Sequence, residues 1–105
     1  MDIQEKIRSQ ITENPIVLYM KGTPQFPRCG FSGATVQILK TNGLKDFLAV
    51  DVLTDPEIRE AIKVYSNWPT IPQLYIKGEF VGGADIVRDL HEQGELKKLL
   101  DSAVE

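Results

Sequence analysis

The chain has 105 residues, of which 42% are hydrophobic and 26% are charged, enough for one domain with its own core. The net charge of -3 argues against general nucleic-acid binding, and no apolar run approaches the roughly 20 residues that cross a bilayer. The single cysteine excludes a disulfide within the chain and is typical of a reducing compartment. We therefore expect a single domain over residues 1–105, located in the cytoplasm, with an organelle matrix as the alternative.

The N-terminal part predicts a helix followed by a strand. Ile3, Ile7 and Ile11 recur every four residues, which indicates an amphipathic helix, and the Asn14-Pro15 pair ends it. The apolar run over residues 16–20 is typical of a buried strand.

A loop and a second helix come next, with the cysteine between them. Residues 22–28 contain two prolines and a glycine and predict a loop. A helical stripe follows over residues 31–39 and ends near Asn42-Gly43. Cys29 therefore stands at the start of a helix, directly after a strand and a loop, which is an arrangement that makes thiols reactive.

The middle of the chain repeats the strand-then-helix order. Residues 47–52 predict a second strand. Thr54 and Asp55 are capping residues, Pro56 suits the first helical turn, and Glu57 comes three residues after Thr54. Together these signals predict a helix that begins near residue 55.

The C-terminal part predicts a hairpin and two helices. Residues 73–76 and 79–81 flank Lys77-Gly78, as in a β-hairpin. Asp85 is expected as the N-cap of the next helix, and Gly94 separates that helix from the last one. The order α-β-α-β-α-β-β-α-α combines a right-handed βαβ crossover with an antiparallel hairpin. It predicts an α/β domain with a four-stranded mixed sheet flanked by helices on both faces.

The chemistry depends on whether Cys29 is ionised. A thiol with an ordinary pKa near 8.5 is only a few per cent thiolate at pH 7, and lowering that pKa by ~2 units takes about 2.7 kcal/mol. A helix N-terminus supplies typically ~0.3–1 kcal/mol. The N–H groups of Phe31 and Ser32 and the nearby cation Lys21 are therefore expected to help. The alternative is a buried cysteine that acts as a small hydrophobic side chain.

Ser32 occupies the position at which a second thiol would complete a Cys-x-x-Cys pair. A serine cannot resolve a mixed disulfide, so exchange between two thiols of the same chain is excluded. Its hydroxyl also suits a hydrogen bond to backbone in the first helical turn.

Four motifs, in one register over nearly the whole chain, resemble the monothiol glutaredoxins, the Cys-Gly-Phe-Ser branch of the thioredoxin superfamily. They are Met20-Lys21-Gly22-Thr23, Pro27-x-Cys29-Gly30-Phe31-Ser32, Ser66-Asn67-Trp68-Pro69-Thr70-Ile71-Pro72-Gln73 and Gly78-Glu79-Phe80-Val81-Gly82-Gly83-x-Asp85-Ile86. The resemblance implies a thioredoxin-like fold, in agreement with the element order. The sequence departs from many relatives at Ala84, where they carry a second cysteine, so no disulfide can form at that position.

The resemblance also implies a site for glutathione, a peptide with two carboxylates, an ammonium and a thiol. Lys21 and Arg59 would bind its glycyl carboxylate by charge-assisted hydrogen bonds. The alternative for Arg59 is a solvated position on a helix surface. Lys63, one turn further on, either joins them or is an ordinary surface residue.

The rest of the implied site comes from backbone groups. A cis peptide bond at Pro72 would leave the backbone of Ile71 free to pair with the cysteinyl residue of glutathione; the alternative is a proline that merely begins a strand. The N–H groups of Ala84 and Asp85, at a helix N-terminus, would bind the γ-glutamyl end. A plain N-cap is the alternative for Asp85.

Two further residues have competing interpretations. Trp68 either shapes the groove near the thiol, as the resemblance implies, or packs in the core. His91 has no second histidine or cysteine to complete a metal site, so it is interpreted as a surface or helix-end residue.

A [2Fe–2S] cluster generally takes four ligands, and one chain offers one thiolate. The resemblance implies a cluster bridged between two protomers by two Cys29 thiolates and two glutathiones. Such a homodimer would carry the cluster to iron–sulfur acceptor proteins, and a BolA-like protein is a further expected partner; neither nucleic acid nor membrane is expected. The alternative is an enzyme, a glutathione-dependent thiol–disulfide oxidoreductase that removes glutathione from proteins through Cys29 alone. Whether the chain is an enzyme stays open at this point.

Overall fold

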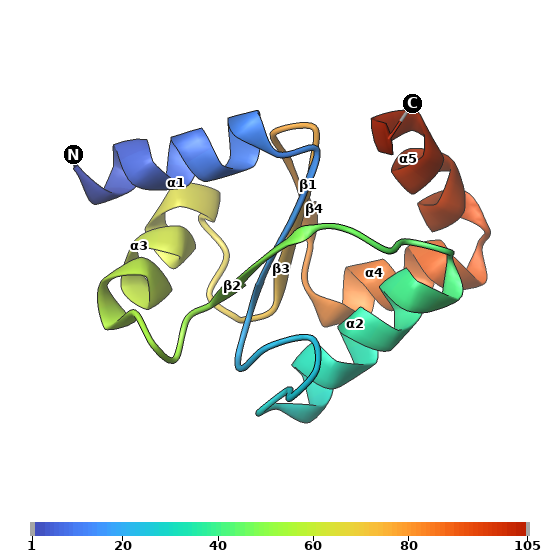
Figure 1. Cartoon of the computed structure of the whole chain (residues 1–105), viewed down its shortest axis with the longest axis horizontal. Coiled ribbons are helices and arrows are strands. Elements are labelled where there is room, and N and C mark those ends of the chain that lie inside the picture. Colours follow the sequence, from blue (N-terminus) through green and yellow to red (C-terminus); the bar gives the residue numbers. More distant parts are fainter. Residues whose placement is uncertain (1, 105) are drawn as a thin grey trace.

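The computed structural model describes residues 2–104, and within that range it contains five helices and four strands (Figure 1). In chain order they are α1 (Ile3–Glu13), β1 (Ile16–Met20), α2 (Gly30–Thr41), β2 (Leu48–Asp51), α3 (Pro56–Ser66), β3 (Gln73–Ile76), β4 (Glu79–Gly82), α4 (Ala84–Glu92) and α5 (Glu95–Val104). None of these helices is both long and apolar enough to span a bilayer.

The strands form one mixed sheet in the order β2-β1-β3-β4. β1 and β2 run parallel, whereas β3 is antiparallel to both β1 and β4. Helices α1 and α3 lie on one side of the sheet, and α2, α4 and α5 lie on the other (Figure 1). The predicted α/β fold, with a four-stranded mixed sheet between two helical layers, is confirmed.

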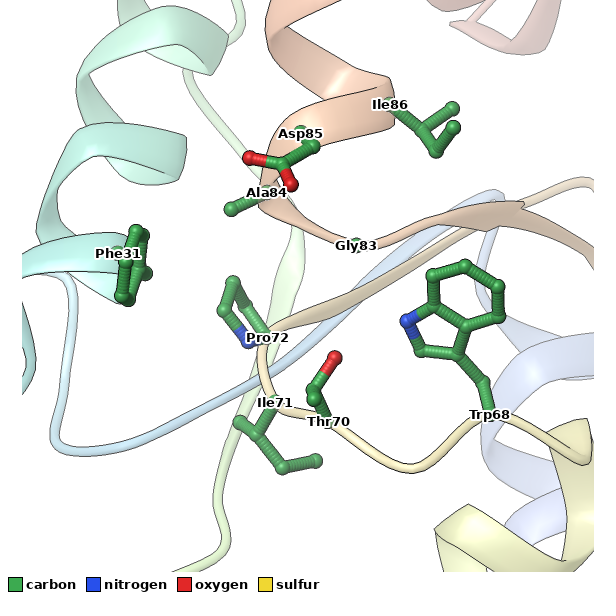
Figure 2. A pocket seen from close by; sticks show the side chains of 9 residues that line it. All are labelled: Phe31, Trp68, Thr70, Ile71, Pro72, Gly83, Ala84, Asp85 and Ile86. Carbon is green, nitrogen blue, oxygen red and sulfur yellow. The ribbon is translucent and has the colours of Figure 1, made fainter.

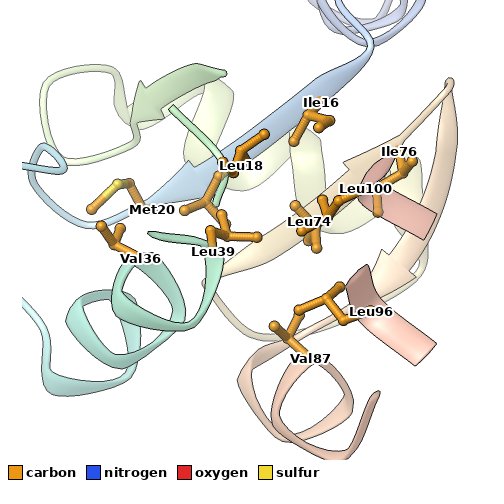
Figure 3. Close-up of a cluster of buried hydrophobic side chains, with 11 residues drawn as sticks. Ile16, Leu18, Met20, Val36, Leu39, Leu74, Ile76, Val87, Leu96 and Leu100 are labelled. Carbon is orange, nitrogen blue, oxygen red and sulfur yellow. The ribbon is translucent and has the colours of Figure 1, made fainter. Parts of the chain in front are cut away.

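β1 lies inside the sheet, and its side chains alternate between two hydrophobic cores. Ile16, Leu18 and Met20 pack with residues of α2, α4 and α5 (Figure 3). Val17 and Tyr19 pack with residues of α1 and α3 on the other face. Burial of a large aliphatic side chain contributes about 1.5–3 kcal/mol. The strand that leads to Lys21 and Cys29 is therefore anchored on both faces.

The start of α3 agrees with the sequence prediction. Pro56 is the first helical residue, and the Asp55 carboxylate caps the helix by accepting from the Ile58 N–H at 3.2 Å. β2 covers residues 48–51, one residue shorter at each end than the predicted strand.

The start of α4 corrects the sequence prediction, because the N-cap is Gly83 and not Asp85. The Gly83 carbonyl accepts the first helical hydrogen bond, from the Val87 N–H at 3.0 Å. Asp85 lies in the first turn, exposed, with its carboxylate 3.7 Å from Arg88. An acidic residue stabilises a helix N-terminus both as the N-cap and within the first turn, so the sequence alone does not show which of these positions Asp85 occupies.

Candidate functional site

Cys29 is the N-cap residue of α2, as the sequence predicts for a thiol at the start of a helix. Its backbone is extended, and its carbonyl accepts from the Gly33 N–H at 2.9 Å. The residue is partly exposed and is free of any disulfide. A thiol in this position faces the unpaired N–H groups of the first helical turn, which stabilise a thiolate.

The surroundings of the thiol lower its pKa below the ordinary value, and the main cause is the backbone N–H of Ser32. Burial opposes this and raises the pKa, while the N–H of Phe31 and the hydroxyl of Ser32 lower it further. The charge of Lys21 is the smallest of these contributions. The three groups expected from the sequence to lower this pKa, which are the N–H groups of Phe31 and Ser32 and the charge of Lys21, all do so, and the N–H of Ser32 contributes most.

Ser32 is fully buried and connects two elements. Its hydroxyl oxygen accepts a hydrogen bond from the backbone N–H of Lys21 at 3.1 Å, across 11 residues of sequence. The interaction ties the start of α2 to the residue that follows β1. The sequence predicted that this hydroxyl bonds backbone, and the partner that the structure shows fixes the start of α2 relative to the sheet.

The loop before Cys29 is held by short-range and long-range hydrogen bonds. The Lys21 carbonyl accepts from the Arg28 N–H at 2.9 Å, and the Asp51 carboxylate accepts from the N–H of Gly22, also at 2.9 Å. Gly22 has a φ of 93°, and a Cβ there would lie 2.6 Å from the Phe26 carbonyl oxygen, so this corner requires glycine. The loop therefore presents Lys21 and Cys29 from a fixed base.

Asp51 is a positioning residue that the sequence analysis missed. It lies at the end of β2, beside the end of β1, and its carboxylate also accepts from the Leu53 N–H at 2.9 Å. The only sequence signal was an acidic residue at the end of a predicted parallel strand, where polar side chains often meet the neighbouring loop.

A cationic cavity of about 210 Å³ lies beside the loop. Its lining residues are Lys21, Arg59, Lys63, Pro69, Thr70 and Ile71. The Arg59 Nε atom is buried and has no hydrogen-bond partner among the residues described, although a buried guanidinium N–H is normally paired. Lys63 lines the same cavity, but its ammonium lies 3.1 Å from the Glu60 carboxylate. Arg59 is therefore the cation with the clearest unused donor.

A second cavity, of about 220 Å³, adjoins the first through Thr70 and Ile71, which line both (Figure 2). It is lined by Phe31, Trp68, Thr70, Ile71, Pro72, Gly83, Ala84, Asp85 and Ile86. In Figure 2, Phe31 and Trp68 stand on opposite sides, and the start of α4 closes a third side. We call the two cavities together the groove.

Backbone groups complete the lining of the groove. The Ile71–Pro72 peptide bond is cis, as the resemblance implied. No hydrogen bond joins the backbone of Ile71 to another residue within 2–104. The N–H groups of Ala84 and Asp85 belong to the first turn of α4, where a helix has no internal acceptors for them.

The predicted binding residues thus come together: Lys21, Arg59, Ile71, Ala84 and Asp85 all line the groove. Cys29 itself lines neither cavity. Residues close to Cys29 line both cavities: Phe31, in the same helical turn, lines the second, and Lys21, at the start of the loop, lines the first.

Trp68 lines the groove, as the resemblance implied, and is not part of either hydrophobic core. Its ring packs on Phe80 with centroids 5.8 Å apart, yet it is 37% exposed and lines the groove. A Cβ on Gly83 would lie 3.0 Å from the indole nitrogen, so the indole edge sits directly over the start of α4. His91 lies in the last turn of α4, as expected, and its ring nitrogen pairs at 3.1 Å with the side-chain amide of Asn42, the C-cap residue of α2.

Within the described range, no three His, Cys, Asp or Glu side chains gather in a way that could hold a metal ion.

Comparison with known proteins agrees with this geometry. The glutaredoxin family pattern matches residues 16–81. The chain is 52% identical over 104 residues to the mitochondrial monothiol glutaredoxin-5 of Lachancea kluyveri, covering 97% of this chain and 73% of that protein. It is 53% identical over 96 residues to glutaredoxin 4 of Escherichia coli strain K12, covering 91% and 83%.

A solved structure shows the same likeness. The solution structure of reduced apo GrxS14 from poplar has a TM-score of 0.83 and 43% identity, covering 97% of this chain and 93% of that one. The fold, the lone thiol at the start of α2 and these matches together show that the chain belongs to the glutaredoxin family, in its monothiol branch.

Proposed function

We propose that this glutaredoxin binds glutathione in the groove and carries a [2Fe–2S] cluster, bridged between two protomers, for delivery to iron–sulfur acceptor proteins. The observation that carries the proposal is the lone Cys29 thiol, with a lowered pKa, beside a groove that has a cationic end. Glutaredoxins as a family use glutathione, which supports the first half of the proposal.

The charges of the groove suit the charges of glutathione. The Arg59 guanidinium, whose Nε has no partner among the described residues, and the Lys21 ammonium can bind the glycyl carboxylate, since charge-assisted hydrogen bonds are stronger than neutral ones. At the other end, the N–H groups of Ala84 and Asp85 can bind the γ-glutamyl carboxylate. Between them, the free backbone of Ile71 can pair with the cysteinyl residue as a neighbouring strand would.

Ligand stoichiometry supports the cluster. Ser32 and Ala84 stand where other redox proteins of this kind carry a second thiol, so Cys29 contributes one ligand of the four that a [2Fe–2S] cluster generally takes. A second protomer and two glutathiones supply the remaining three. Since glutathione exchanges freely, the cluster is held loosely and is cargo rather than a permanent redox centre.

The second candidate is a glutathione-dependent oxidoreductase, and the lowered pKa of Cys29 favours it, because the thiolate is the attacking species. The thiolate would attack the glutathione sulfur of a glutathionylated protein and release that protein's thiol. A second glutathione would then attack the Cys29–glutathione disulfide, which regenerates the Cys29 thiolate and leaves oxidised glutathione.

The proposed binding partners of the protein are those that would share the Cys29 site. The cluster-bridged homodimer is the proposed form of the carrier, and a BolA-like protein is a proposed alternative partner at the same thiol.

The relatives include a mitochondrial yeast protein and a bacterial one. We propose a reducing compartment, either the cytoplasm or an organelle matrix, because Cys29 must stay reduced.

Anaerobic reconstitution with iron, sulfide and glutathione tests the proposal. It predicts a brown dimer with visible charge-transfer absorption, which bleaches and becomes monomeric when glutathione is removed. A colourless monomer that rapidly removes glutathione from a model protein disulfide would favour the oxidoreductase. Cys29→Ser serves as the control, because it should abolish both outcomes.

A further inference from the structure

We propose that Gln73 is a positioning residue for the groove, and that its buried amide holds residues 68–70 in the shape that glutathione binding requires. The inference rests on the proposed glutathione site. It concerns a residue that lines neither cavity and acts only through the loop that does.

Gln73 is the first residue of β3 and is fully buried. Its Nε2 atom donates to the carbonyl oxygens of Trp68 and Thr70, both at 3.1 Å. Its Oε1 atom accepts from the Tyr75 hydroxyl at 3.2 Å. Both N–H donors of the amide are thus directed at one loop, and its oxygen is anchored to the sheet.

The loop that Gln73 holds forms one wall of the groove. Trp68 and Thr70 line the second cavity, and Thr70 also lines the cationic one (Figure 2). The Trp68 N–H donates to the Lys63 carbonyl at 3.2 Å and to the Ser66 hydroxyl at 3.1 Å. With the Gln73 bond to its carbonyl, both backbone groups of Trp68 are therefore fixed.

The direction of these bonds has a consequence for an anionic ligand. Gln73 draws the carbonyl oxygens of Trp68 and Thr70 toward the interior, whereas the backbone of Ile71 has no partner within 2–104. Carbonyl oxygens released into the groove would repel the carboxylates of glutathione and compete for the cations that bind them. The amide therefore keeps the Trp68 and Thr70 carbonyls paired, while the backbone of Ile71, which lines both cavities, has no partner within 2–104.

Few side chains could replace glutamine here. A glutamate offers no donor to either carbonyl, and a methionine of similar length leaves both carbonyls without a partner. An asparagine is one methylene shorter, so its amide cannot keep both 3.1 Å bonds. A fully satisfied buried amide makes its surroundings rigid, which is the property that a preformed ligand wall needs.

The test compares Gln73→Met with Tyr19→Phe by measuring glutathione binding to the full chain calorimetrically. The proposal predicts that Gln73→Met weakens binding about 5- to 20-fold, because a loop that the two hydrogen bonds no longer hold must be ordered when glutathione binds. The pKa of Cys29 should stay unchanged, because the start of α2 is untouched. Tyr19→Phe removes a hydrogen bond to Gln10, 2.7 Å long, and that bond does not involve the loop. It should lower the melting temperature while leaving the affinity within about twofold.

An affinity within about twofold of wild type for folded Gln73→Met would overturn the proposal. So would equal losses of affinity in the two variants, since these would indicate a general effect of reduced stability. If Gln73→Met does not fold, Gln73→Asn takes its place, with the same expected loss and the same contrary result. Failure of the wild-type chain to bind glutathione would instead refute the proposed function, so the two failures are distinguishable.

Discussion

The hydroxyl oxygen of Ser32 accepts a hydrogen bond from the backbone N–H of Lys21 at 3.1 Å, and Ser32 is fully buried. The same side chain lowers the pKa of the Cys29 thiol, in addition to the larger effect of its own backbone N–H. The residue at the position of a missing second thiol therefore has two structural roles. It aligns the first turn of α2 with the end of β1, and it stabilises the thiolate.

Ser32→Ala should accordingly affect both stability and reactivity. The Lys21 N–H loses its acceptor in a partly buried place, which costs about 1–3 kcal/mol of unfolding free energy. The pKa of Cys29 should rise, because one of the groups that lowers it is gone. Urea unfolding measures the first effect, and a pH titration of thiolate absorbance measures the second.

Thr41→Ala is the matched control for that experiment. Its hydroxyl bonds the Gln37 carbonyl within an exposed turn of α2, at 2.8 Å. Its removal should change the unfolding free energy by less than about 0.5 kcal/mol and leave the thiol unaffected. Equal effects of the two substitutions would show that the Ser32 bond has no special role.

The lowered pKa of Cys29 also predicts how stability depends on pH. The folded thiol has a pKa below the ordinary value, so near the ordinary value of about 8.5 the unfolded chain binds more protons than the folded chain. The thiol therefore contributes stability that is present above about pH 8.5 and is lost as the pH falls through the folded pKa. The difference in urea midpoint between wild type and Cys29→Ala should shrink as the pH falls; a difference independent of pH would contradict this.

Arg59 is predicted to contribute to binding but not to stability. Its Nε is buried without a partner, so Arg59→Met removes an unpaired polar group and should leave the unfolding free energy equal or higher. The binding free energy for glutathione should weaken by about 1.5–3 kcal/mol, the range for a hydrogen bond to a charged group. Lys97→Met is the control, because it removes only an exposed pair with Asp101 on α5. Affinity that is unchanged in Arg59→Met would remove Arg59 from the site.

Gly83→Ala tests the close approach between Trp68 and the start of α4. The new Cβ would lie 3.0 Å from the indole nitrogen and 3.4 Å from the Pro72 carbonyl oxygen, so the indole must move within the groove. We expect about tenfold weaker glutathione binding, measured by calorimetry, with Cys29 reactivity toward a small thiol reagent unchanged. Gly33→Ala, where the nearest atoms lie at an ordinary 3.5 Å, should leave the affinity as it is. Equal affinities of the two variants would argue against a ligand at this end of the groove.

Most of the fold could be predicted because its signals are local. The spacing of Ile3, Ile7 and Ile11 and the cap at Asp55 each specify one element without reference to the rest of the chain. The N-cap of α4 could not be placed, because the carbonyl that accepts the first helical bond belongs to a glycine with no side-chain signal.

The candidate site likewise has a part that could be predicted from the sequence and a part that could not. The positions of Lys21, Arg59 and Ile71 followed from motif resemblance, and the structure brings them into one groove. The hydrogen bonds of Ser32 to Lys21 and of Gln73 to Trp68 join residues whose partners are fixed only when the strands and loops pack. Composition and periodicity carry no information on such bonds, which is why the partner of the Ser32 hydroxyl and the role of Gln73 could not be predicted.

Native mass spectrometry of the anaerobically reconstituted protein tests the central claim most directly. If Cys29 supplies one ligand of four, the holoprotein should have the mass of two chains with one [2Fe–2S] cluster and two glutathiones, and Cys29→Ser should give only the metal-free chain. A cluster held by one chain, or by a dimer that lacks glutathione, would contradict the account.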